Sequence, residues 1–283
     1  MPTADQLIES GRKHLLNHVD KFSRVGDERD QATELLAYAA GREITDGIEV
    51  DPRTAQRYER FLERRSTGEP VPYIRGFETF SGLKLAVKPG VFIPRDSTQF
   101  LAKQAVARLR GRKNPVGADL ATGVGAVALA MADAVPSARV YGTDLAPLAV
   151  RLARANARAN RLPNARFVTG SMFDPLPRAL RGGIDVIASH PPYVATDELD
   201  DLPAEIGFEP TMTITDSSSD GLGLVRLLID EGREWLKRDG WMCIEIAPDL
   251  ARPVRTMLSR AGYRNVKSTR GIHEYSRVLV AKR

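Results

Sequence analysis

The chain has 283 residues, of which 42% are hydrophobic and 27% charged, with a formal net charge of +5. This balance is typical of a globular protein and excludes a disordered chain, and the modest basic excess does not by itself indicate an acidic partner. No apolar run approaches the ~20 residues of a membrane span, and the first residues lack a signal-peptide core, so we expect a cytoplasmic protein without a membrane partner.

Residues 1–70 are predicted to form a small helical domain. Apolar residues recur at helical spacing in DQATELLAYAAG and in RTAQRYERFLERR, and strand-like alternation is absent. From Glu69 onward, Pro, Gly, aromatic and β-branched residues occur at the short spacing of a hairpin or an extended connector. We therefore place a β-hairpin or linker at residues 71–98.

Residues 99–283 alternate between strand-like apolar runs and helical patterns. The runs are VGADLA, ARVYGTDL, ARFVTGS, IDVIAS and GWMCIEIA. This alternation predicts an α/β fold with a mostly parallel sheet wound with helices. The only cysteine, Cys243, lies in the last run, so the chain has no intrachain disulfide and we expect no metal site built on cysteine.

A glycine-containing loop, Asp119-Leu-Ala-Thr-Gly123-Val-Gly125, follows the first of these strands. Its glycines let the backbone approach a ligand, and the helix that follows offers free N–H groups. Dinucleotide-binding domains share this spacing, so the loop alone is weak evidence. However, Asp119 is suited to hold an ammonium group, and Asp144, at the end of the next strand, is suited to bind ribose hydroxyls. The two carboxylates favour S-adenosylmethionine over a nucleotide with a pyrophosphate.

A second loop, Ser189-His190-Pro191-Pro192-Tyr193, follows the fourth strand. Consecutive prolines fix an extended backbone whose carbonyl groups lack local N–H partners and are able to face a substrate. Ligands of α/β sheets bind at the carboxyl ends of the strands. The loop is therefore predicted to face a substrate at the same edge of the sheet as the first loop.

These two loops resemble those of class I methyltransferases, and the order of motifs along nearly the whole chain resembles the HemK-type glutamine methyltransferases of release factors. The segments that carry this resemblance are ERRSTGEPVPYIRGFETFSGLKLAVKPGVFIPR, FEP at 208–210, DGLG at 220–223, LKRDGWMCIEI and the terminal SRVLVAKR. The resemblance implies a Rossmann-like catalytic domain with a seven-stranded sheet at residues 99–283, preceded by a helical substrate-recognition domain.

The resemblance also implies the residues of the site. It assigns S-adenosylmethionine to Asp119, Ala121, Thr122, Gly123, Gly125, Asp144, Leu145, Ser171, Met172 and His190. It assigns the acceptor to Arg95, Ser189, His190, Pro191, Pro192 and Tyr193, with His190, Pro191 and Tyr193 as the catalytic group. In the family, an Asn side chain and the first proline carbonyl accept the amide hydrogens, and the aromatic ring packs on the substrate.

Four positions depart from the family pattern. His190 replaces the Asn of the acceptor motif, Asp96-Ser97-Thr98-Gln99 replaces Pro-Glu-Thr-Glu, Ser171 replaces an acidic residue, and Ala121 replaces a glycine. His190 matters most, because a neutral imidazole offers one donor and one acceptor and can gain a proton near neutral pH. It is expected to suit an amine, guanidine or hydroxyl better than a glutamine amide, either as a base or as a spacer.

The leading hypothesis is therefore a diverged methyltransferase that acts on a nitrogen, or in second place an oxygen or carbon, of a small molecule or amino acid. Methylation of a release-factor glutamine is the first alternative, because the helical domain and connector are retained. A nucleic-acid base methyltransferase is the second, although no target-recognition domain is evident. An oxidoreductase would leave Asp119 and the Pro-Pro-Tyr loop unexplained, and a non-catalytic module would bind the cofactor without turning it over. The acidic stretch TDELDDLPAEIGFEP is expected to be a lid, or else a solvated loop.

Overall fold

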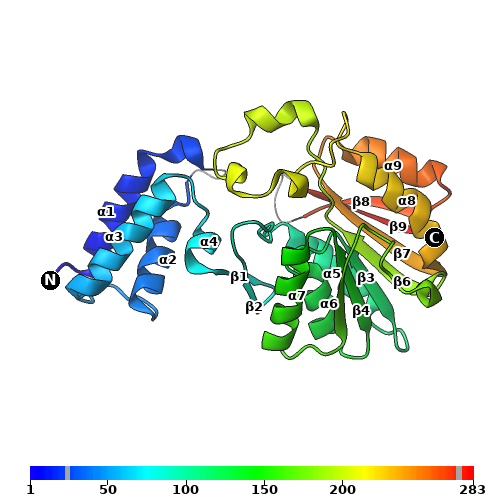
Figure 1. Cartoon of the computed structure of the whole chain (residues 1–283), viewed down its shortest axis with the longest axis horizontal. Helices are drawn as coiled ribbons and strands as arrows, with labels where there is room; N and C mark the ends of the chain where they lie inside the picture. Colours follow the sequence, from blue (N-terminus) through cyan, green and yellow to red (C-terminus); the bar gives the residue numbers. More distant parts are fainter. Residues whose placement is uncertain (23–25, 272–275) are drawn as a thin grey trace. The chain divides into compact units, whose positions relative to one another are not determined.

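The computed structural model describes residues 1–22, 26–271 and 276–283. The chain divides into a helical unit, made of Met1–Phe77, Lys88–Gly90 and Asp200–Glu209, and a catalytic unit that contains the rest. None of the helices in the described ranges combines the length and apolarity needed to cross a bilayer. The helical unit contains α1 (Ala4–Leu16), α2 (Glu28–Ala40), α3 (Pro52–Ser66) and α4 (Val71–Arg75) (Figure 1).

The helices of the helical unit begin and end at residues with clear stereochemical roles. Asp51 caps α3 by accepting hydrogen bonds from the amides of Arg53 (3.0 Å) and Thr54 (3.1 Å), and Pro52 occupies the first helical position. The C-cap of α2 is Gly41, whose φ of +68° is readily adopted by glycine. The apolar faces of these helices meet in one core that includes buried leucines and Tyr58.

A buried arginine joins the segment Asp200–Glu209 to this helical unit. The Arg65 side chain is 1% exposed, donates to Gln31 Oε1 (2.6 Å) and lies 3.2 Å from the carboxylate of Glu205. Its guanidinium also packs over the ring of Phe22. Burial lowers the pKa of Arg65, and the charge of Glu205 opposes that shift. The chain that leaves the acceptor loop thus contributes to the helical unit before it re-enters the catalytic one.

Seven strands form one mixed sheet in the described part of the catalytic unit, in the order β5-β4-β3-β6-β7-β9-β8. They are β3 (Val116–Leu120), β4 (Arg139–Asp144), β5 (Ala165–Thr169), β6 (Ile184–Ser189), β7 (Leu236–Ile246), β8 (Arg264–Arg270) and β9 (Arg277–Lys282). Strands β3 to β7 pair in parallel, and β9 runs antiparallel to both β7 and β8. The predicted α/β fold is confirmed, and the five predicted apolar runs correspond to β3 to β7.

Helices cover both faces of the sheet, as Figure 1 shows. Helices α5 (Thr98–Leu109), α6 (Ala126–Ala134) and α7 (Pro147–Ala159) pack on one face, and α8 (Gly223–Trp235) and α9 (Ala251–Arg260) on the other. Neighbouring residues of a strand serve opposite faces: in β6, Val186 belongs to the first core and Ile187 to the second. Because both faces are buried, the central strands are continuous apolar runs.

A two-stranded hairpin, β1 (Phe77–Phe80) and β2 (Leu83–Ala86), precedes the sheet. Its turn residues Ser81 and Gly82 have φ values of +50° and +82°, the positive angles that tight hairpins require. Asn156 of α7 binds both backbone groups of Ala86, at 2.8 and 3.2 Å. The helical unit therefore continues to residue 77, beyond the predicted boundary at 70, and most of the hairpin belongs to the catalytic unit instead of forming a separate linker.

Candidate functional site

A pocket lies at the carboxyl ends of β3, β4 and β6, where the strand order reverses on either side of β3. It contains about 1030 Å³ of space, part of it continuous with solvent. All of the predicted cofactor residues except Gly125 line it, namely Asp119, Ala121, Thr122, Gly123, Asp144, Leu145, Ser171, Met172 and His190. Gly125 has another role: a Cβ there would approach Phe167 to 3.0 Å and Ala153 to 3.2 Å, so the glycine permits close packing where α6 begins.

Asp119 presents a buried carboxylate at the floor of the cofactor loop. It is 2% exposed, and its Oδ2 accepts hydrogen bonds from the Thr122 hydroxyl (2.5 Å) and the Ala128 amide (3.0 Å). Both bonds engage the same oxygen, which leaves Oδ1 available to a ligand. Burial raises the pKa of Asp119 to about 7, against the two hydrogen bonds, and the charge of Asp144 adds to the rise. A cationic ligand would restore the ionised form.

Asp144, the last residue of β4, holds the backbone of two loops. Its Oδ2 accepts from the Gly123 amide (2.8 Å) and its Oδ1 from the Ala146 amide (2.9 Å). Burial raises the pKa of Asp144, and these two hydrogen bonds oppose the rise. Each oxygen keeps a second lone pair, so two ribose hydroxyls can still donate to this carboxylate. Leu145, 58% exposed, offers an apolar surface beside it.

Two lining residues without the freedom of glycine adopt left-handed backbone angles. Ala121 has a φ of +58° and Met172 a φ of +42°. The Met172 carbonyl accepts a hydrogen bond from the Thr143 hydroxyl (2.7 Å), which holds that strained loop in place. Such strain gathers at ligand sites. The angle of Ala121 also gives a physical reason for the glycine that class I loops usually carry there.

The acceptor loop is tied to the sheet through its first residue. Ser189 is fully buried and donates to the Leu120 carbonyl of β3 (2.6 Å), so its position does not support the predicted contact with substrate. Pro191 is also buried and Pro192 lines the pocket. Ser189 therefore anchors the loop, and His190 and Pro192 form pocket wall.

The imidazole of His190 lies between two aromatic rings. Phe92 meets it edge to face and Tyr193 stacks on it, each with centroids 5.6 Å away. Its Nδ1 lies 3.1 Å from Thr98 Oγ1 and 3.8 Å from Oε2 of Glu245, which is 0% exposed. Burial lowers the pKa of His190, the charge of Glu245 opposes this, and Arg95 adds to the lowering. A neutral imidazole follows at neutral pH.

Comparison with known proteins identifies the family. Residues 82–205 match the methyltransferase small domain and residues 14–76 the PrmC N-terminal domain. The release factor glutamine methyltransferase of Aliivibrio fischeri is 33% identical over 80% of this chain and 78% of its own length. That of Neisseria gonorrhoeae is 34% identical over 95% of this chain and 91% of its own length. The chain belongs to the release factor glutamine methyltransferase family.

Solved structures agree at the level of the fold. The hMettl16 catalytic domain superimposes with a TM-score of 0.58 at 16% identity, covering 78% of this chain and 81% of that one. A methyltransferase from Pyrococcus furiosus superimposes with a TM-score of 0.54 at 20% identity, covering 71% of this chain and 89% of that one. This member of the family is an S-adenosylmethionine-dependent methyltransferase, and the open oxygen of Asp119, the lone pairs of Asp144 and the strained loops around them fit that cofactor.

Arg95 and Tyr193, the other predicted acceptor residues, lie around His190 without lining the pocket. The Arg95 guanidinium lies over the Phe92 ring, with 4.5 Å from its carbon to the ring centroid. Burial raises the pKa of Tyr193 to about 12, so its hydroxyl stays neutral. Phe92, Thr98 and Glu245 also belong to this cluster and were not predicted from the sequence. Only Glu245 left a signal, as a lone acidic residue in an apolar strand.

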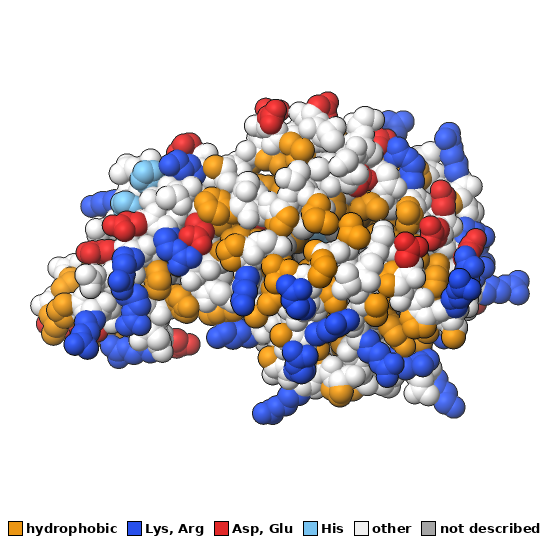
Figure 2. All heavy atoms as spheres, in the orientation of Figure 1, with side chains coloured by type: hydrophobic (Ala, Val, Ile, Leu, Met, Phe, Trp, Pro, Cys, Tyr) orange, Lys and Arg blue, Asp and Glu red, His pale blue; other side chains and the backbone are white. Residues whose placement is uncertain are grey.

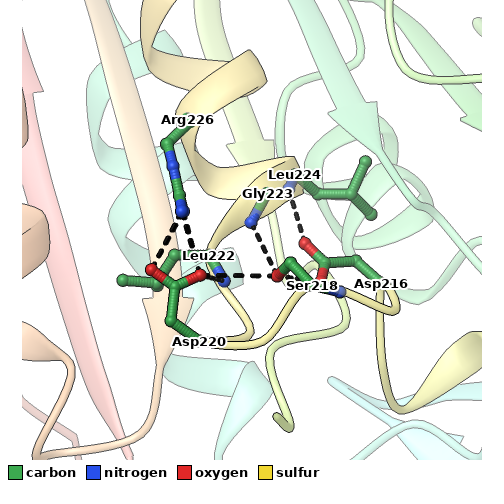
Figure 3. A network of polar contacts seen from close by, with 7 residues as sticks. All are labelled: Asp216, Ser218, Asp220, Leu222, Gly223, Leu224 and Arg226. Atoms are coloured by element: carbon green, nitrogen blue, oxygen red, sulfur yellow. Dashed lines mark hydrogen bonds and ion pairs between the residues drawn. The ribbon is translucent and has the colours of Figure 1, made fainter. Parts of the chain in front are cut away.

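The loop before α8 connects two residues of the pocket wall, Thr213 and Leu224, and Figure 3 shows the polar network that holds this loop. Asp216 accepts hydrogen bonds from the Leu224 amide (2.7 Å) and the Ser218 amide (2.9 Å), and Ser218 Oγ accepts from the Gly223 amide (3.2 Å). These bonds satisfy free N–H groups at the start of α8. Leu224 lines the pocket, so the cap also positions a wall residue.

Basic side chains do not form a single stripe on the visible surface. Figure 2 shows Lys and Arg side chains spread over this face with Asp and Glu among them. A shallow groove on α7 and β5 is lined by Arg154, Arg158, Arg161 and Arg166. Of these, Arg154 donates to the Phe167 carbonyl at 2.7 and 3.0 Å, so it joins α7 to β5. This arrangement adds nothing in favour of the nucleic-acid hypothesis.

Proposed function

We propose that this enzyme transfers a methyl group from S-adenosylmethionine to the side-chain amide nitrogen of a glutamine in a peptide chain release factor. The observation that carries the proposal is that similarity to release factor glutamine methyltransferases extends over both units, including the PrmC N-terminal domain match at residues 14–76. The retained second unit supplies a further surface for a protein substrate.

In this proposal the protein orients the reactants and excludes water, because the sulfonium of bound S-adenosylmethionine supplies an already activated methyl group. Asp119 receives the ammonium of the cofactor and Asp144 its ribose hydroxyls. His190 and the Pro191 carbonyl accept the two amide hydrogens, which directs the nitrogen lone pair at the methyl group. The Tyr193 ring, stacked on His190, extends this aromatic surface toward the substrate.

A small-molecule or amino-acid acceptor is the second candidate, and one observation favours it: His190 replaces the Asn whose amide complements glutamine. Similarity to known enzymes supports the release factor over this candidate. The lid expected at TDELDDLPAEIGFEP remains a proposal for either acceptor. Most of its second half belongs to the helical unit, and Met212 and Thr213, just beyond it, line the pocket.

The deciding experiment offers both acceptors to one enzyme. The purified protein is incubated with methyl-labelled S-adenosylmethionine and either a recombinant release factor from the same organism or a small-molecule extract. Mass spectrometry then locates the label, and an Asp144→Ala variant, weakened in cofactor binding, reports the labelling that this enzyme does not catalyse. Label on a release-factor glutamine supports the proposal. Label confined to the small-molecule pool overturns it in favour of the second candidate.

A further inference from the structure

Behind the acceptor loop lies a carboxylate without a hydrogen-bond partner. Glu245 is on β7, between β6 and β9, and is 0% exposed. Neither of its side-chain oxygens has a hydrogen-bond partner among the residues that the structure describes. An ionised carboxylate in such a place is unfavourable unless it serves a nearby polar group. The nearby group is His190, whose Nδ1 lies 3.8 Å from Glu245 Oε2.

We propose that Glu245 is a positioning residue that selects the tautomer of His190, with the proton on Nδ1 and the lone pair on Nε2. A neutral imidazole carries one proton, on one nitrogen or the other. The negative carboxylate attracts an N–H dipole at Nδ1 and repels a lone pair there. Thr98 Oγ1 lies 3.1 Å from the same nitrogen, and its hydroxyl can accept the Nδ1 hydrogen because a hydroxyl group both donates and accepts. The carboxylate therefore selects the tautomer, and the hydroxyl is compatible with it.

The other groups around the ring keep it neutral. Arg95 disfavours a second proton, and burial acts in the same direction, while Glu245 alone opposes them. Phe92 and Tyr193 contribute ring faces and edges, and the pKa of the Tyr193 hydroxyl is raised, so it carries no charge at neutral pH. His190 therefore acts in one neutral tautomer and not as a cation.

The chosen tautomer explains how histidine can stand where the family has Asn. An Nε2 lone pair accepts a hydrogen bond, as the Asn carbonyl oxygen does, so His190 can receive one hydrogen of an amide nitrogen. The opposite tautomer would direct an N–H at the nucleophile and compete for the lone pair that must attack the methyl group. The tautomer stands on the structure alone, whereas its use for a glutamine amide rests on the proposed function.

Nuclear magnetic resonance of ¹⁵N-histidine-labelled full-length enzyme tests the tautomer without any acceptor. Long-range ¹H–¹⁵N correlations distinguish protonated from unprotonated ring nitrogens, and the His190→Asn variant assigns the signals. We expect protonated Nδ1 in the native chain and a shift toward protonated Nε2 in Glu245→Leu. Cys243→Ala, a buried change two positions earlier on β7, should leave the tautomer unchanged. Protonated Nε2 in the native chain, or no response to Glu245→Leu, overturns the proposal.

A double-mutant cycle tests the consequence for catalysis with whichever acceptor is methylated. We expect Glu245→Leu to lower kcat about tenfold, the size of one direct coupling, while S-adenosylmethionine binding is kept. In the His190→Asn background the same change should have little effect, because an amide side chain has no tautomer to select. Equal losses of kcat in both backgrounds would mean that Glu245 supports the fold and does not act through the tautomer of His190. If the release factor is not methylated but the tautomer responds as expected, the proposed function fails and this inference stands.

Discussion

Ala121 shows how much a single methyl group matters in the cofactor loop. Its φ of +58° lies in the left-handed region, which disfavours a residue with a Cβ by about 1–2 kcal/mol. Ala121→Gly removes that strain but loosens the unfolded chain, at a cost of about 0.4–1 kcal/mol. We therefore expect the free energy of unfolding to rise by up to about 1 kcal/mol in denaturant titrations. The control Ala155→Gly, inside α7, should lower it by about 1 kcal/mol; a similar loss in both variants would contradict the strain argument.

Asp119 makes the stability of the folded protein depend on pH. Because burial raises its pKa to about 7 from 3.8, the folded protein binds a proton that the unfolded chain has released between these values. Its contribution to stability is thus present below about pH 4 and is lost as the pH rises through 7.

If Asp119 receives the ammonium of S-adenosylmethionine, the bound cation lowers that pKa, so binding below pH 7 releases a proton and strengthens as the pH rises. Calorimetry in buffers of different ionisation enthalpy measures this release, and Asp119→Asn should abolish it. Unchanged proton release in Asp119→Asn would assign it to another group.

At the scale of elements, the cap of α8 is the contact that we expect to stabilise a helix and a pocket wall together. Asp216→Ala should lower the free energy of unfolding by about 1 kcal/mol, because the amides of Ser218 and Leu224 lose their acceptor. Burial alone would raise the pKa of Asp216, but hydrogen bonds from Ser218 and Leu224 outweigh it and lower the pKa. The Asp216 carboxylate therefore stabilises the fold fully above pH 3.8, its pKa in the unfolded chain. This stabilisation is lost as the pH falls through the lower pKa of the folded protein.

Asp220→Ala is the matched control for this cap, since Asp220 lies in the same loop (Figure 3). Asp220 pairs with Arg226, and its Oδ1 also accepts a longer hydrogen bond from the Leu222 amide (3.2 Å). The side chains of Asp220 and Arg226 are 49% and 46% exposed, so water screens the pair and the loss of Asp220 should cost less, about 0.5 kcal/mol. Urea titrations of the two variants at neutral pH give the comparison. An equal effect of both changes would show that the capping bonds of Asp216 contribute no more than a surface pair.

At the scale of the whole molecule, the chain crosses five times between two units, and the pocket described above lies in the catalytic one. Hydrogen exchange with saturating S-adenosylmethionine should slow at the amides of Gly123 and Ala146, which border the cofactor loops, and near Met212 and Thr213. Residues 200–209 should not respond, although they lie close to Met212 in the sequence, because they belong to the helical unit. Protection spread evenly over both segments would contradict this division.

The sequence alone was sufficient to predict the strands whose two faces are both buried. Strands β3 to β7 are buried on both sides, which produces continuous apolar runs, and the predicted cofactor residues that line the pocket lie at or just after the carboxyl ends of β3, β4, β5 and β6. Strand β8 was not predicted because most of its side chains are exposed, so no alternation of apolar and polar residues marks it. The domain boundary near residue 70 shifted because Pro72 and Gly76 belong to a short helix and its cap instead of a connector.

The amino-acid sequence by itself determined the family, the fold and most of the cofactor pocket, because each depends on motifs and periodicities that are local in the chain. Only the tertiary structure decided the surroundings of His190, which bring Phe92, Thr98 and Glu245 together from three distant segments. Whether a histidine acts as a base, a spacer or a hydrogen-bond acceptor depends on burial and on which nitrogen meets a carboxylate. Those properties arise from packing between strands and loops, and no spacing in the sequence encodes them directly.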